Sequence, residues 1–250
     1  MKKLVVYTAL FSHDPDNLIY GDIIHYQHEK NSNVDYVCFT NIKQLQSNIW
    51  DIRYIDEIWK DARNTSRQFK VLPQKYLPEY ENWLWMDAQC YFMYDPLSLC
   101  EYYLNNVDIA VHIHSDRNCI YQEGHICNMR SENRDPAGLL MKQLDYYKQN
   151  GYPENGGLYE NGVLFRKNNK LVCNINEQWW KHIKDWTTED QISFTYVCSQ
   201  YKNLKIYGID DAICEHRPIL ITKKSEHFAT VPRHWRNISN GYEQHPSYCI

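Results

Sequence analysis

WLWMDAQCYFMYDP, residues 83–96, is the stretch from which the fold of this chain can be predicted. The large apolar residues before Asp87 indicate a buried strand, and Asp87 stands where that strand ends. In open α/β sheets, ligands bind in the crevice outside the carboxyl ends of the strands. Asp87 is therefore predicted to face a ligand, and Gln89 adds a second oxygen that suits Mg²⁺ or Mn²⁺. The alternative is an Asp that only caps the next turn.

Strand and helix signals alternate along the chain, which predicts an α/β fold with a mixed, mostly parallel central sheet flanked by helices. The length of 250 residues suits one domain spanning 1–250, with residues 218–250 as a C-terminal tail or lid. Further strands are predicted at residues 4–11, 34–40, 52–55, 107–113 and 159–165. Helices are predicted at residues 22–30, from Asp61, from Asp95 to about Asn105, from Asp135 to Gly151 and from Thr188.

Composition limits the classes of partner. The chain has 27 basic and 31 acidic residues, a formal net charge of −4 and a pI near 6.2. Nucleic-acid-binding proteins are usually more basic, so no nucleic-acid partner is expected. The nine cysteines lack CxxC spacing and several lie in apolar runs, which indicates reduced thiols and a cytoplasmic protein. Because no apolar run has membrane-spanning length, peripheral membrane contact is the most that the sequence allows.

Three cations precede the Asp87 strand at helical spacing. Arg63, Arg67 and Lys70 are four and three residues apart, which places them on one face of the helix that begins at Asp61. Such a face is most often solvated, and that is the simpler interpretation. The functional interpretation is a diphosphate clamp, because a guanidinium presents a rigid fork of donors to phosphate oxygens.

A pair of histidines and a single acid later in the chain are further candidates for the site. His112 and His114 alternate at the end of a predicted strand, so they share one face and can bind a metal or a substrate, although structural histidines are commoner. Glu160 lies where a loop meets the next strand, a common position for substrate-binding and catalytic acids.

The run TTEDQISF opens a helix. Capping of the helix N-terminus explains Thr188 and Glu189. The pair that follows, Asp190 and Gln191, is predicted to point into the interior or a cleft, because the apolar face begins directly after it.

Seven blocks of this sequence, in this order, resemble the plant mucilage- and turgor-related glycosyltransferase-like family, long catalogued as a domain of unknown function. The blocks are VYTALF, FTN, R-x-x-x-R-x-x-K, WLWMDAQ with DPL, HIHSDRNCIYQE, GLYENGVLFR and TEDQISFTYV, spread over about residues 4–207. That family is similar to glycosyltransferase family 8. The resemblance therefore implies a GT-A-like (Rossmann-like) fold and a nucleotide-sugar-dependent glycosyltransferase.

The resemblance also implies roles for individual residues. Thr8 and Ala9 would line the nucleotide pocket, and the three cations would approach the diphosphate. Asp87 would open a DxD-like motif whose third position is Gln89, and His216 would complete a site for Mn²⁺ or Mg²⁺. An amide is a weaker cation ligand than a carboxylate. Gln89 therefore leaves open an alternative in which a basic side chain takes the place of the metal ion. The acceptor is predicted to contact His112, His114, Arg117 and Glu123.

The predicted activity is transfer of a hexosyl or pentosyl group, with a UDP-sugar favoured, to a glycan, polysaccharide or glycoconjugate. If the configuration inverts, Asp190 is the predicted base for the acceptor hydroxyl. If the configuration is retained, Gln191 or Glu160 would face the β side of the sugar while the leaving phosphate assists the acceptor. The resemblance slightly favours retention.

Two alternatives from other classes stay open. A hydrolase of a glycoside or lipid amide would use Asp87, Glu160 and Asp190 as acids around a water molecule. Hydrolysis, however, gives no role to three cations on the helix before Asp87. A non-catalytic nucleotide-sugar-binding module would bind without turnover, and Gln89 at the second position of the acidic motif keeps that interpretation open.

Overall fold

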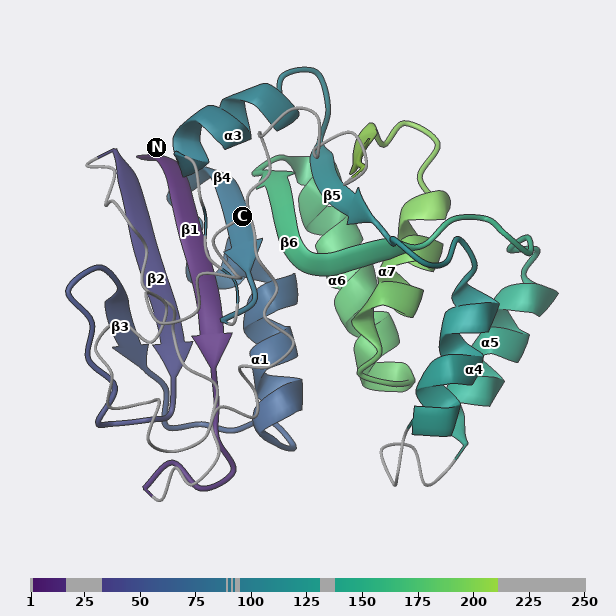
Figure 1. The fold of residues 1–250 in the computed structure, drawn as a ribbon, viewed down its shortest axis with the longest axis horizontal. Helices are drawn as coiled ribbons and strands as arrows, with labels where there is room; N and C mark the ends of the chain where they lie inside the picture. Colours follow the sequence, from purple (N-terminus) through teal and green to yellow (C-terminus); the bar gives the residue numbers. More distant parts are fainter. Residues whose placement is uncertain are drawn as a thin grey trace, which may run out of the picture.

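The computed structural model of the chain describes residues 2–16, 33–88, 90, 92, 95–130 and 138–210. A seven-stranded sheet runs through them in the order β3-β2-β1-β4-β6-β5-β7 (Figure 1). β6 is antiparallel to its neighbours β4 and β5, and the other neighbouring pairs are parallel. The predicted class, an α/β fold with a mixed and mostly parallel central sheet flanked by helices, is confirmed. The strands are β1 (Lys2–Leu10), β2 (Val34–Thr40), β3 (Asp51–Tyr54), β4 (Tyr80–Met86), β5 (Ile109–Ile113), β6 (Tyr159–Lys167) and β7 (Ile206–Ile209).

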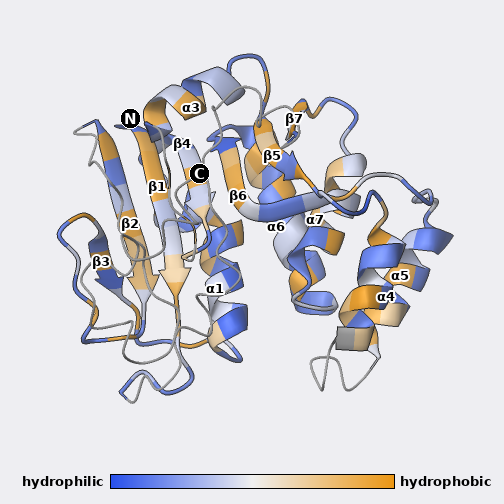
Figure 2. Cartoon of the chain, viewed as in Figure 1, coloured by the Kyte–Doolittle hydropathy of each residue, from blue (hydrophilic) through white to orange (hydrophobic). Residues whose placement is uncertain are grey.

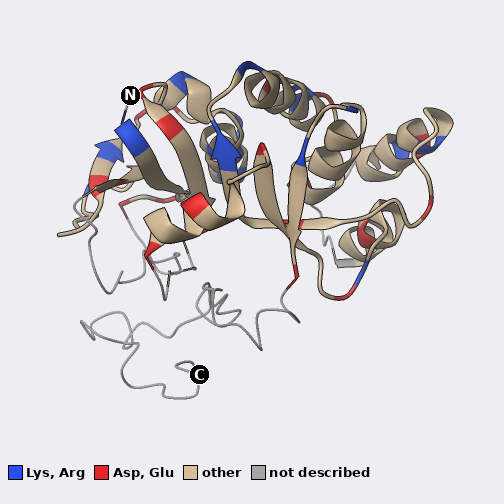
Figure 3. Ribbon diagram, turned by 90° about the horizontal axis from the view of Figure 1, so that it is seen from above, with Lys and Arg blue, Asp and Glu red and all other residues tan. Residues whose placement is uncertain are grey.

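Helices cover both faces of this sheet. α1 (Ala62–Val71), α6 (Lys170–Asp185) and α7 (Asp190–Ser199) pack on one face, and α3 (Pro96–Tyr103) packs on the other. α2 (Pro73–Tyr76) follows α1 directly, while α4 (Ile120–Arg130) and α5 (Leu139–Gln149) form a pair next to α7 (Figure 1). Acidic and basic residues are dispersed over the described helices and strand ends (Figure 3).

The strands are apolar on both sides because both faces of the sheet are covered. In β1, Val5, Tyr7 and Ala9 pack toward α1, whereas Leu4 and Val6 pack toward α3. The same division continues in β2 and β4, whose buried residues are split between the two core clusters. Figure 2 shows orange, hydrophobic segments in β1, β2 and β6. This explains why the sequence shows continuous apolar runs and not a clean alternation of polar and apolar residues.

Most predicted elements appear close to their predicted bounds. β3 begins at Asp51, and β5 begins at Ile109, two residues later than predicted. Asp95 caps α3 as predicted, since its side chain accepts a hydrogen bond of 2.8 Å from the backbone N–H of Ser98. Gly151 follows α5 with a φ of +82°, the left-handed conformation predicted for it.

Other predictions fall on segments that the structure does not describe. The helix at residues 22–30, the cap at Asp135 and the lid at residues 218–250 lie outside the described residues, so the domain bounds stay a prediction. Within the described part, α4 was not predicted. Gly124 lies in this helix against Leu144 of α5, and a Cβ at Gly124 would come within 2.4 Å of Leu144 Cδ1. A larger residue at Gly124 would therefore force the Leu144 side chain to move at this close approach of α4 and α5.

The order of the strands sets the position of the candidate site. β1 and β4 are parallel neighbours, so their carboxyl ends reach the same edge of the sheet. The backbone N–H of Asp87 donates to the carbonyl of Gly162 at 2.8 Å, which holds the residue after β4 against β6. Ala9, Asp87 and the acid-bearing start of β6 therefore meet at one edge, over which α1 and the start of α7 lie.

Candidate active site

The cations of α1 become more deeply buried toward the end of the helix. Asp61 caps the helix, and its side chain accepts a hydrogen bond of 2.7 Å from the backbone N–H of Asn64. The exposed fraction of the side chain falls from 32% at Arg63 to 19% at Arg67 and 2% at Lys70. The solvated-surface interpretation is therefore wrong for Arg67 and Lys70.

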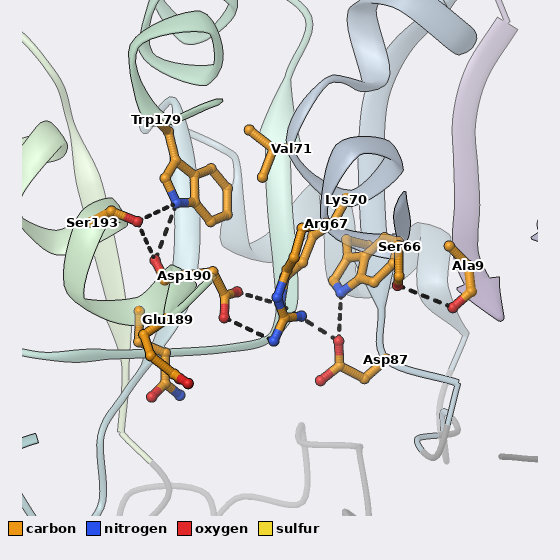
Figure 4. A network of polar contacts seen from close by, with 12 residues as sticks. Ala9, Ser66, Arg67, Lys70, Val71, Asp87, Trp179, Glu189, Asp190 and Ser193 are labelled. Carbon is orange, nitrogen blue, oxygen red and sulfur yellow. Dashed lines mark hydrogen bonds and ion pairs between the residues drawn. The ribbon is translucent and has the colours of Figure 1, made fainter. Parts of the chain in front are cut away.

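The buried cations share one carboxylate. Asp190 Oδ1 lies 3.0 Å from Arg67 Nη2, and Asp190 Oδ2 lies 2.7 Å from Lys70 Nζ (Figure 4). Lys70 Nζ is also 3.5 Å from Oδ1 of Asp87, and that oxygen accepts a hydrogen bond of 2.8 Å from the indole N–H of Trp85. These contacts join the end of β4, the last turns of α1 and the start of α7. The prediction that Asp190 points inward is confirmed, since it is 4% exposed.

The charges in this network shift pKa values in opposite directions. Burial would raise the pKa of Asp190, but Arg67 and Lys70 outweigh burial and lower it from 3.8 to about 2. Burial would lower the pKa of Arg67, but the carboxylates around it raise it. Asp190 is thus ionised at neutral pH and is a weak proton acceptor, which does not suit the base predicted for an inverting enzyme.

Glu189 extends the network to Arg63. Its Oε1 lies 2.9 Å from Arg63 Nη2, and the pair is partly buried. Glu189 occupies the N-cap position of α7, but its side chain makes no capping hydrogen bond. The capping interpretation of Glu189 is therefore wrong, because its carboxylate is directed to a cation on α1 instead.

A cleft of about 310 Å³ opens beside these residues. Ala9, one of the two residues predicted to line a nucleotide pocket, lines this cleft, whereas Thr8 is fully buried and its hydroxyl has no hydrogen-bond partner among the described residues. Phe11 and His13, from the loop after β1, also line the cleft and were not predicted; the turn-forming run SHDPDN after a strand end is the signal that could have found them. The full lining is Ala9, Phe11, His13, Ala62, Arg63, Ser66, Arg67, Trp85, Asp87 and Ala88.

A second cluster of polar side chains forms where β5, β6 and α4 meet. His114 Nε2 lies 3.0 Å from Arg117 Nη2 and 3.9 Å from Glu160 Oε1. Arg117 Nε donates to Glu123 Oε2 at 2.6 Å. His112 is buried on β5, in register with Glu160 across a bulge. The structure thus brings together the residues predicted to bind the acceptor, beside the candidate acid Glu160.

Cys127 connects the two clusters. Its thiol lies 3.4 Å from Glu123 Oε1 and 3.8 Å from Glu189 Oε2. Burial and the two carboxylates raise the pKa of Cys127 to about 12, so it stays a thiol and donates to them. A line of polar contacts therefore runs from Arg117 to Arg63. Gln191, the second residue of α7, is half-buried and follows Asp190 directly.

The metal prediction is only partly covered by the described residues. Asp87 is described, whereas Gln89 and His216 lie outside the described residues. Across residues 2–16, 33–88, 90, 92, 95–130 and 138–210, no group of three or more His, Cys, Asp or Glu side chains gathers that could hold a metal ion. Asp87 Oδ1 is in addition already contacted by Trp85 and Lys70. The residues present do not by themselves fit a Mn²⁺ or Mg²⁺ site, so that ion stays a prediction.

Comparison with known proteins identifies the family. The apo structure of the bifunctional glycosyltransferase WbbM is 15% identical with a TM-score of 0.49, over 83% of this chain and 38% of that one. The chain therefore spans well under half of WbbM. Mouse xyloside xylosyltransferase 1 is 11% identical with a TM-score of 0.42, over 83% of this chain and 84% of that one. No curated protein sequence matches at a significant level. The family model of the TOD1/MUCI70 glycosyltransferase-like domain matches residues 24–224, and the chain belongs to that family.

Proposed function

We propose that the chain transfers a sugar from a nucleoside-diphosphate donor, UDP-sugars being favoured, to a hydroxyl of a glycan or glycoconjugate. The observation that carries this proposal is the cleft at the carboxyl ends of β1 and β4, where Arg63, Arg67 and Asp87 line one space. That space lies next to a second polar cluster around Glu160. Donor and acceptor would thus meet between the two clusters.

In this proposal Arg63 and Arg67 bind the diphosphate. Both line the cleft and keep exposed side-chain surface. Arg63 is held by Glu189 in a partly buried ion pair, and a phosphate would take the place of this carboxylate as the anionic partner of the guanidinium. Guanidinium groups bind phosphate oxygens through two parallel hydrogen bonds and stabilise the charge that develops on the leaving diphosphate.

Lys70 has a different role from the one first predicted. Its ammonium group is buried between Asp190 and Asp87, so we assign it to holding these two carboxylates in place and not to direct phosphate contact. Asp190 in turn holds Arg67 at the cleft. Asp87 would face the donor, since it lines the cleft and its side chain is 27% exposed.

Retention of configuration is the mechanism we favour. Asp190, with a pKa lowered to about 2 by Arg67 and Lys70, is poorly suited to take the acceptor proton. The leaving phosphate oxygen would then accept that proton. Glu160 or Gln191 would stand on the β side of the sugar and stabilise the positive charge that develops at the anomeric carbon.

The acceptor would bind on the other side of Glu160. His114, Arg117 and Glu123 offer ring nitrogen, guanidinium and carboxylate groups that can exchange hydrogen bonds with sugar hydroxyls.

The seven described cysteines are free thiols, which supports a reducing, cytoplasmic location. None of the described helices is long and apolar enough to cross a membrane.

The direct test is release of free nucleotide from a panel of UDP-, GDP-, CDP- and ADP-sugars, each with and without Mn²⁺ and with mixed oligosaccharides as acceptors. We expect release from the sugars of one nucleotide, and a dependence on Mn²⁺ would assign an ion to Asp87. NMR of the product formed first should show the anomeric configuration of the donor. If a nucleotide-sugar binds but no nucleotide is released, the chain is a non-catalytic module. If no nucleotide-sugar binds and no nucleotide is released, the hydrolase is favoured.

A further inference from the structure

Arg166 is a fully buried arginine that the proposed mechanism does not use. It lies in β6, on the face that packs against α1 and α6, and is 0% exposed. Arginine is almost never fully buried unless its charge is compensated, because removal of an ion from water is costly. The contacts of this guanidinium therefore call for a physical explanation.

The described acceptors of the Arg166 guanidinium are all neutral. Nη2 donates to the carbonyl of Lys70 at 2.6 Å and to the hydroxyl of Tyr7, and Nη1 donates to the side chain of Asn176 at 2.8 Å. Nη1 also lies 3.4 Å from the carbonyl of Val71. Burial lowers the pKa of Arg166. Two of its four acceptors are thus the last carbonyls of α1.

These carbonyls explain how the buried charge is tolerated. The last carbonyls of a helix have no partner inside the helix, and they carry the negative end of its dipole. Arg166 supplies both a hydrogen-bond donor and a positive charge at that end of α1. Tyr7 adds a second donor, since its hydroxyl donates to the carbonyl of Lys70 at 2.9 Å. Burial raises the pKa of Tyr7 to about 12, so the phenol keeps its proton.

The same turn of α1 carries the buried cation of the candidate site. We propose that Arg166 and Tyr7 are positioning residues, which fix the backbone of Lys70 so that its ammonium group lies between Asp190 and Asp87. The two strands that supply them, β1 and β6, lie on either side of β4, which ends at Asp87. The sheet itself thereby sets the distance from Lys70 Nζ to Asp190 Oδ2, which is 2.7 Å.

The geometric part of this proposal stands without the proposed function, whereas its effect on catalysis rests on that function. A displacement of about 1 Å at a positioned group can cost roughly a hundredfold in rate. Loss of the Arg166 and Tyr7 contacts to the end of α1 should therefore lower turnover of the donor by a large factor. The affinity for the nucleoside diphosphate should change less, because Arg67 and Arg63 lie about one and two turns earlier in α1.

The test measures how well Lys70 is shielded from an amine-acylating reagent, read by mass spectrometry of its peptide. Tyr7→Phe removes one hydroxyl and keeps the ring, and Arg166→Met removes the guanidinium. We expect acylation of Lys70 to rise by about tenfold or more in both variants, because the last turn of α1 is released. Arg166→Lys keeps a positive charge near the helix end and should give an intermediate rate.

The matched control is Val172→Ala, which removes buried apolar surface on α6 and makes no polar contact with α1. It should lower the melting temperature without exposing Lys70. If Lys70 stays as protected in Tyr7→Phe as in the wild type, the contacts of Arg166 and Tyr7 do not position Lys70 and the proposal is wrong. If Lys70 becomes reactive but wild-type protein releases no nucleotide, the positioning holds and the proposed function fails.

Discussion

Asp87→Ala is expected to reduce donor turnover by about 10²–10³-fold while the protein stays folded. Asp87 is the described carboxylate that lines the cleft, and it stands at the end of β4 where the donor would meet the sheet. Its side chain is partly exposed, and Lys70 keeps its closer partner, Asp190, when Asp87 is removed. The measurement is nucleotide release, together with the melting temperature.

The control for this variant is Asp95→Ala. Asp95 is also a carboxylate that follows β4, but it caps α3 on the opposite face of the sheet. Its loss should cost about 1 kcal/mol of stability and leave turnover unchanged. Wild-type turnover in Asp87→Ala would remove Asp87 from the mechanism.

Asp190→Asn is expected to lower the free energy of unfolding by roughly 3–5 kcal/mol and to abolish turnover. The substitution leaves Arg67 and Lys70 without their shared counter-ion in a buried site. If the pairing of charges is the cause, Lys70→Met should offset part of the loss. The double variant should therefore show a coupling of about 1 kcal/mol or more in a double-mutant cycle, without regaining turnover.

The pH dependence of stability gives an independent check on Asp190. Its pKa is about 2 in the folded protein against an ordinary value of 3.8. The resulting stabilisation, roughly 2 kcal/mol, is complete above the ordinary pKa and is lost as the pH falls from 3.8 toward 2. Urea unfolding between pH 5 and pH 2 should show this loss in the wild type and a smaller one in Asp190→Asn. The ion-pair interpretation is contradicted if the free energy of unfolding falls equally with pH in the wild type and in Asp190→Asn. It is also contradicted if the effects of Asp190→Asn and Lys70→Met on stability are additive in the double-mutant cycle.

The sequence predicts the sheet well because the strands carry local signals. The apolar runs, the turn-forming run after β1, and caps such as Asp95 are all visible within a few residues. The three cations before Asp87 could also be placed on one helix face from their spacing. Whether that face was solvated could not be predicted, because burial of Lys70 depends on α7 and β6, which lie about a hundred residues later in the chain.

The contacts within the site were beyond the sequence for the same reason. The sequence predicts a base at Asp190 because nothing near it in the chain shows the two cations that lower its pKa. Arg166 was missed because a single arginine near the end of a strand is usually exposed. α4 was missed because Gly124 weakens its helical signal, and only its packing against Leu144 shows why glycine is there.

The central claim is that the cleft beside α1 binds a nucleoside diphosphate, and calorimetric titration with UDP, GDP, CDP and ADP tests it most directly. Wild-type protein, Arg67→Met and Lys75→Met would each be titrated with and without Mn²⁺. Lys75 is a matched cation on α2 that pairs with Glu177 and does not line the cleft. The account predicts that one nucleotide binds, that Arg67→Met weakens binding by about tenfold or more, and that Lys75→Met does not. If no nucleotide binds, or if Arg67→Met binds as tightly as the wild type, the cleft is not the donor site.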